Sequence, residues 1–154
     1  MAARNSEAAD SARREITATR LLDAPRALVW AAWTDPKHIA KWWGPNGFTN
    51  TIHEMDVRPG GVWRFIMHGP DGTDYDNEIV FTQVMKPSLL AYDHVSPKFH
   101  VTVTFAEEGS KTRLMMRMLF DSAAERDDVV EKYGAVEGLN QTLNRLAGYV
   151  GATA

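Results

Sequence analysis

The chain has 154 residues, of which 44% are hydrophobic and 24% charged, and its formal net charge is −3. This length and balance suit one globular domain and exclude the collagenous, low-complexity and disordered classes. Lysine and arginine are scattered along the chain, which argues against nucleic acid as a partner, because phosphate binding needs a clustered basic face. The absence of cysteine excludes disulfides, thiol catalysis and cysteine-bound zinc.

The N-terminal residues are polar and rich in alanine. They lack the apolar core of a secretory signal, and no run in the chain approaches the roughly 18 apolar residues of a membrane span. We therefore expect a flexible tail over residues 1–13, a single domain over residues 14–152, no membrane span and a cytoplasmic location.

The first expected element is a strand at residues 15–22, where apolar and polar residues alternate. A proline opens the stretch 25–33, which carries a helical stripe of large apolar side chains. Asp35 is placed to cap a second helix over residues 36–43, and the Gly-Pro-Asn-Gly run at 44–47 ends it. The pattern predicts one strand followed by two short helices.

Residues 48–120 alternate with a period of two in six further stretches, with bulky apolar side chains on one side and mostly polar ones on the other. This pattern is typical of an antiparallel sheet with one buried face. With the first strand it predicts about seven strands. The expected turns contain glycine or proline and fall at residues 58–61, 69–72, 86–87, 96–97 and 108–110.

The C-terminal region carries an apolar stripe at spacings of three and four, formed by Val129, Tyr133, Val136, Leu139, Leu143, Leu146 and Val150. This spacing predicts one long amphipathic helix, the only element long enough to cover the sheet. Gly134 and Gly138 are unfavourable inside it and indicate a bend, a close contact with another element or a late start of the regular helix. The expected fold class is α+β.

Three segments resemble a known family: the tryptophan-rich residues 24–45, the Asp-Val-Arg-Pro-Gly-Gly-Val-Trp-Arg-Phe run at 56–65, and residues 138–146. They are similar to the SRPBCC (START-like, helix-grip) superfamily, and within it to the branch named after the activator of the heat-shock-protein-ninety ATPase. The resemblance implies a START/Bet v-like fold, in which the sheet wraps around the long C-terminal helix. The superfamily includes lipid carriers, hormone receptors, polyketide cyclases and co-chaperone modules, so function has to be argued from the site.

The predicted inner face of the sheet mixes aromatic residues, methionines and isolated polar groups. An apolar pocket with a few placed polar groups has this composition, and methionine suits an adaptable surface. A fully packed core with satisfied polar atoms is the alternative. The candidate ligand-binding residues are Trp63, Phe65, Met67, Tyr75, Asn77, Ile79, Tyr92, His94, Val101, Val103, Met116, Met118, Phe120, Tyr133 and Val136.

Four tryptophans between residues 30 and 43 are interpreted as anchors of the two short helices, with the adjacent pair Trp42 and Trp43 as candidates for a cavity mouth. Residues 56–61 are interpreted as a structural turn, across which Asp56 and Arg58 could pair.

The five histidines lack metal-ligand spacing, and no nucleophile elbow or phosphate-binding glycine loop is present. We therefore assign no metal, no cofactor and no catalytic residue. His94 is the one histidine on the inner register that merits a test as an acid–base group.

The favoured function is non-catalytic binding of a hydrophobic small molecule, such as a lipid, a polyketide or an aromatic metabolite, between the sheet and the C-terminal helix. One alternative is a small cyclase- or hydratase-like enzyme that uses the same cavity, with His94 beside Tyr92 or Asn77. The other is a co-chaperone-like module that acts on a chaperone ATPase and is linked to stress. The expected assembly is a monomer or a homodimer.

Overall fold

The structure is a computed structural model that describes residues 12–153. Its strands are β1 (Glu15–Leu22), β2 (Thr49–Met55), β3 (Val62–His68), β4 (Asp74–Met85), β5 (Leu89–His94), β6 (Phe99–Glu108) and β7 (Lys111–Leu119). Its helices are α2 (Arg26–Thr34), α3 (Pro36–Trp42), α4 (Ala123–Tyr133) and α5 (Ala135–Thr153). Nearly all of the predicted N-terminal tail lies outside the described residues, so the tail and the domain boundary stay predictions.

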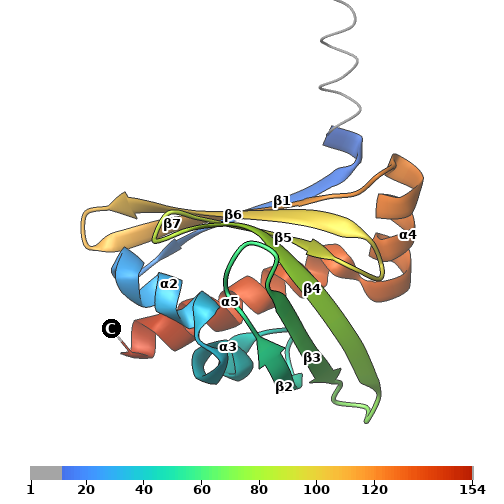
Figure 1. Cartoon of the computed structure of the whole chain (residues 1–154), viewed down its shortest axis with the longest axis horizontal. Coiled ribbons are helices and arrows are strands. Elements are labelled where there is room, and N and C mark those ends of the chain that lie inside the picture. The colour runs from blue at the N-terminus through green and yellow to red at the C-terminus, as the bar shows by residue number, and fades with distance from the viewer. Residues whose placement is uncertain (1–11, 154) are drawn as a thin grey trace, which may run out of the picture.

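The seven strands form one antiparallel sheet in the order β1-β7-β6-β5-β4-β3-β2, as the alternating pattern predicts. The sheet bends, and α5 crosses its concave side (Figure 1). Both ends of the sheet contact this helix. Arg20 of β1 donates to the side-chain oxygens of Asn140 and Asn144, and Arg145 of α5 binds the loop that leads into β2. The sheet therefore wraps around α5, and the predicted fold class is confirmed.

The two short helices form where the sequence places them. Asp35 caps α3, since its Oδ1 accepts a hydrogen bond of 2.9 Å from the backbone N–H of Lys37. Trp30, Trp33 and Trp42 are buried between these helices and the sheet, so they anchor the helices as predicted.

The prediction of one unbroken helix through residues 129–150 is wrong. Gly134 has φ of +61°, in the left-handed region, and its N–H donates to the carbonyl of Val130, which ends α4. α5 then starts at Ala135. Of the two glycines, Gly134 is the one at which the helix breaks. Gly138 makes a close contact, because a Cβ there would lie 3.3 Å from Cγ of Pro45.

The helix break changes the predicted apolar stripe. Val129 and the four stripe residues from Leu139 onward are buried, as expected. Tyr133 and Val136 flank the break and are 51% and 38% exposed, so they do not face the sheet and their placement on the inner face was wrong. A residue in the left-handed conformation interrupts the 3.6-residue period of a helix, so residues before and after Gly134 no longer point to the same side.

Arg145 of α5 fixes the loop between α3 and β2. Its guanidinium donates to five backbone carbonyls, those of Lys41, Trp43, Gly44, Pro45 and Phe48, at 2.9 to 3.3 Å. Burial lowers the pKa of Arg145. The sequence interpretation did not single out this residue, because a lone arginine on a helix carries no local pattern.

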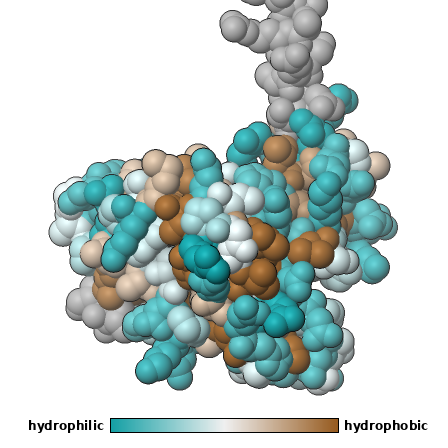
Figure 2. Space-filling view, in the orientation of Figure 1, coloured by the Kyte–Doolittle hydropathy of each residue, from teal (hydrophilic) through white to brown (hydrophobic). Residues whose placement is uncertain are grey.

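Figure 2 shows the same face of the molecule as Figure 1, with hydrophilic residues along the rims and hydrophobic ones near the middle. Among the described residues, no helix is both long and apolar enough to cross a membrane.

Candidate functional site

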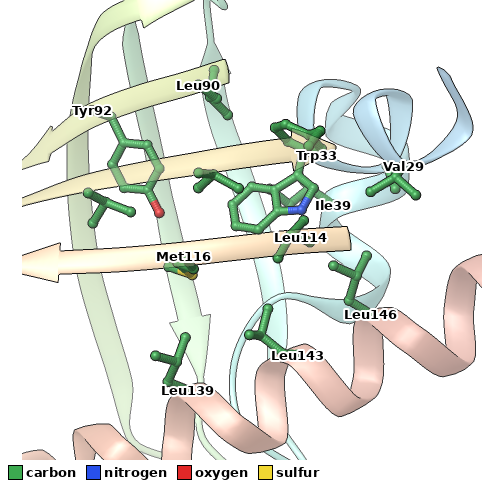
Figure 3. Packing of buried hydrophobic residues seen from close by; sticks show 14 of the residues in the cluster. Val29, Trp33, Ile39, Leu90, Tyr92, Leu114, Met116, Leu139, Leu143 and Leu146 are labelled. Carbon is green, nitrogen blue, oxygen red and sulfur yellow. The ribbon is translucent and has the colours of Figure 1, made fainter. Parts of the chain in front are cut away.

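The inner face of the sheet gathers most of the predicted ligand-binding residues. Figure 3 shows part of this layer, with Tyr92 and Met116 on the sheet facing Leu139 and Leu143 of α5. The predicted residues that are buried are Trp63, Phe65, Ile79, Tyr92, His94, Val101, Val103, Met116, Met118 and Phe120.

Aromatic rings form the centre of this layer. Trp63 stacks on Phe65 at a centroid distance of 4.3 Å and meets Tyr92 edge to face at 6.4 Å. On the helix side Trp43 contacts both Trp33 and Trp63, at 5.4 and 5.1 Å. The tryptophans of the short helices and the aromatic residues of the sheet therefore form one continuous cluster, which sequence analysis had treated as two separate groups.

Three polar groups in this cluster have no hydrogen-bond partner among the described residues. They are the indole N–H groups of Trp33 and Trp63, which are buried, and the hydroxyl of Tyr92. Tyr92 is 1% exposed, and burial raises the pKa of its hydroxyl. Figure 3 shows this hydroxyl pointing into the layer between the sheet and α5. A buried donor without a partner is unfavourable by about 1–3 kcal/mol, so each of these groups needs an explanation.

His94 is buried on the predicted side of β5, and its ring is fully engaged. Nδ1 donates to the carbonyl of Pro97 at 2.8 Å, and Nε2 lies 2.8 Å from the side-chain amide of Asn77. The ring also stacks on Phe99 at 4.6 Å. Both nitrogens are thus occupied by neighbouring groups, which suits a structural role better than proton transfer to a bound molecule.

Burial lowers the pKa of His94, and the bond to the Pro97 carbonyl partly opposes this effect. An unfolded histidine titrates near pH 6.5, so below this pH the unfolded chain takes up a proton before the folded one does. We expect the free energy of unfolding to fall as the pH drops below 6.5, until the lower folded pKa is passed.

The measurement is urea unfolding of wild type and His94→Gln between pH ~7.5 and ~5.5. In His94→Gln, the free energy of unfolding should no longer fall as the pH drops below 6.5 for the reason given above. The control His100→Gln changes an exposed histidine on the outer face and should keep it, since His94 is still present. An unchanged slope in His94→Gln would contradict the assignment.

The other predicted residues lie at the rim. Tyr75 is 38% exposed and contacts Phe48, so its assignment to the buried face was wrong. Met67 and Asn77 are half-buried. Trp33 was not predicted to belong to the site, because no local sequence pattern reveals that its N–H lacks a partner among the described residues.

Two open surface hollows lie among the described residues near α4, and neither is lined by Trp63, Tyr92 or Met118. One, of about 550 Å³, lies at the α4–α5 junction and is lined by residues that include Val136 and Asn140. The other, of about 370 Å³, lies between α4 and the β5–β6 turn, where Lys98 pairs with Asp121. Neither hollow reaches the unpartnered donors of the inner layer.

The outer face of the sheet carries exposed histidine–carboxylate pairs. His68 lies 2.7 Å from Oδ1 of Asp74 and 2.7 Å from the hydroxyl of Thr51, and His100 pairs with Asp93. Arg58 binds Asp56 across the turn, as expected. Within residues 12–153, no group of three or more histidine, aspartate or glutamate side chains is arranged to hold a metal ion.

A curved antiparallel sheet that wraps around one long helix defines the helix-grip class of the SRPBCC superfamily. Within this class, the chain belongs to the family described as Activator of Hsp90 ATPase homolog 1-like protein, whose model matches residues 23–151. No protein with a curated description matches the chain.

Solved structures show the same fold. A protein from Arthrobacter aurescens is 25% identical with a TM-score of 0.86, over 92% of this chain and 88% of that one. A protein from Mycobacterium smegmatis is 28% identical with a TM-score of 0.84, over 94% and 96%. An AHSA1-like protein from Aeromonas hydrophila is 25% identical with a TM-score of 0.74, over 90% and 93%.

Proposed function

We propose that this protein binds a hydrophobic small molecule, without catalysis, between the inner face of the sheet and α5. The observation that carries the proposal is the buried indole N–H of Trp63, which has no partner among the described residues. The buried Tyr92, whose hydroxyl points into the same layer, lies beside it. Such groups are rare in a solid core, because the folded state loses their bonds to water and gains nothing in return. A ligand that accepts a hydrogen bond there removes this penalty.

The lining of the layer can also adapt to a guest. Met116 and Met118 are 4% and 8% exposed and lie beside the aromatic cluster, and methionine side chains repack at low energy. The break at Gly134 leaves α5 joined to α4 through a single left-handed residue. Displacement of the methionines, with a small shift of α5, would admit a ligand to the inner layer.

Native mass spectrometry of protein purified without denaturation tests the proposal. We expect a bound small molecule that is lost when the protein is unfolded. When this molecule is added back to refolded protein at about 100 times its Kd, it should stabilise the fold by roughly 2.7 kcal/mol. Only the bare protein mass, with no stabilisation by any hydrophobic extract, would contradict the proposal.

A pair of adjacent substitutions on β7 provides a sharper test. Met116 faces the inner layer, whereas Met115 is 43% exposed on the outer face. Met116→Phe should fill the adaptable space and weaken or abolish binding, and Met115→Phe should leave it unchanged. Equal binding by both variants would place the ligand elsewhere.

A second candidate function rests on the family match, since the family is described by homology to an ATPase activator. In this alternative the protein is a cytoplasmic, stress-linked, co-chaperone-like module. A chaperone ATPase assay with and without the protein tests it: a stimulated rate favours the alternative, and an unchanged rate removes it. The cyclase-like alternative has no such support, because both nitrogens of His94 are engaged.

A further inference from the structure

We propose that the molecule bound in the inner layer is uncharged and carries a hydrogen-bond acceptor, such as a ketone, quinone, ester or amide oxygen, that lies between the Trp63 indole and the Tyr92 hydroxyl. This inference rests on the proposed function and narrows the class of ligand. Two observations support it: the N–H of Trp63 has no hydrogen-bond partner, and no charged side chain is buried in the layer among the described residues.

The groups without partners at the centre of the layer are donors. An indole N–H only donates, and Trp63 has no acceptor within reach among the described residues. The ring of Tyr92 is the neighbour of Trp63, at 6.4 Å between centroids and 82° between planes. Trp33, the third unpartnered donor, is separated from this pair by Trp43. An acceptor group beside the rings of Trp63 and Tyr92 would satisfy the N–H of Trp63.

The buried threonine hydroxyls already bond to backbone carbonyls of the protein. Thr112 donates its hydroxyl to the carbonyl of Ala24, and Thr142 donates to that of Gly138. Asn50 has an unpartnered buried oxygen, but this residue pairs with Met67, at the far end of β3 from Trp63. A ligand that only donates hydrogen bonds would thus leave the N–H of Trp63 unsatisfied.

The layer also lacks a charge that could compensate a charged ligand. The fully buried polar side chains among the described residues are His94, Thr112 and Thr142, and none is a lysine, arginine, aspartate or glutamate. Burial raises the pKa of Tyr92 and lowers that of His94, so this environment disfavours anions and cations alike. A carboxylate or an amine would enter without a counter-charge, which is strongly unfavourable.

Three matched probes test the inference: methyl naphthyl ketone, ethylnaphthalene and naphthoate. They share one ring system and differ in being a neutral acceptor, a hydrocarbon and an anion. Isothermal titration calorimetry on the full chain gives their affinities. We expect the ketone to bind about 3- to 10-fold more tightly than the hydrocarbon. It should bind more than about 10-fold more tightly than naphthoate.

Tyr92→Phe removes the hydroxyl and keeps the ring, so it should reduce the preference for the ketone about 3- to 10-fold and leave hydrocarbon binding unchanged. Its thermal stability should not fall, because the lost hydroxyl has no partner in the protein. Trp63→Phe is the second variant and should act in the same direction. The control Tyr133→Phe changes an exposed tyrosine and should have no effect on selectivity.

The outcomes separate the two proposals. If the ketone and the hydrocarbon bind equally, if naphthoate binds best, or if Tyr92→Phe keeps the preference, the acceptor inference is wrong while hydrophobic binding stands. If none of the three probes binds and the purified protein carries no ligand, the proposed function itself fails, and the inference fails with it.

Discussion

Arg145→Ala is expected to destabilise the protein by about 3 kcal/mol. The guanidinium supplies the side-chain donors that the structure gives to the carbonyls of Gly44 and Pro45, and its removal leaves these oxygens without that partner. The carbonyl of Trp43 keeps its second bond, from the side-chain amide of Asn50. Of the hydrogen bonds between the α3–β2 loop and α5 among the described residues, the one from the N–H of Asn46 to the side-chain oxygen of Gln141 would remain. Urea unfolding monitored by tryptophan fluorescence measures the change.

Two variants serve as controls for this prediction. Arg145→Lys keeps the charge but not the planar fork, and we expect it to recover no more than about half of the loss. Arg113→Ala removes an exposed arginine that pairs with Glu108 and should change stability far less than Arg145→Ala does, because an exposed ion pair contributes little. Equal effects of Arg145→Ala and Arg113→Ala would show that the five-carbonyl contact does not hold the loop.

Gly61→Ala is expected to destabilise the protein by about 3 kcal/mol or more, or to prevent folding. A Cβ at this position would lie 1.9 Å from the carbonyl oxygen of Asp56, which is a backbone atom and cannot turn aside. The same turn is tied to β4, since Gly60 donates to the carbonyl of Phe81 and Phe81 donates to that of Gly61. The clash therefore cannot be relieved without loss of pairing next to the aromatic cluster.

The neighbouring glycine is the control. Gly60 has φ of +83° but open space where its Cβ would be. Gly60→Ala should therefore show only the strain of the left-handed conformation, about 1–2 kcal/mol. Thermal unfolding of the two variants in parallel gives the comparison, and a larger loss in Gly60→Ala than in Gly61→Ala would refute the steric explanation.

The sheet was predictable because its signals are local. Apolar and polar residues alternate along β3 and β7 because successive side chains of a strand point to opposite faces. A shift of the strand by one residue would move every side chain to the other face. The buried positions of Trp63, Val103 and Met116 confirm the inferred register. The caps and turns were equally local, as Asp35 shows at the start of α3.

The rest depends on contacts between residues far apart in the chain. Gly134 was recognised as unfavourable in a helix, but a left-handed break and a bend give similar sequences, so the exposure of Tyr133 could not be foreseen. Arg145 meets its carbonyls across about 100 residues of sequence. The unpartnered donors at Trp63 and Tyr92 likewise exist only after packing, since a hydrogen bond that is absent leaves no pattern in the sequence.

The strand order has a consequence for how the chain is made. β1 lies at the edge of the sheet and pairs only with β7, so Glu15 can pair only after Leu119 has been synthesised. α5 follows later still. At about 5–20 residues per second, the apolar inner face therefore stays uncovered for several seconds after β3 and β4 have left the ribosome. During synthesis the aromatic residues that later lie beneath α5 are therefore exposed until the last helix has been made.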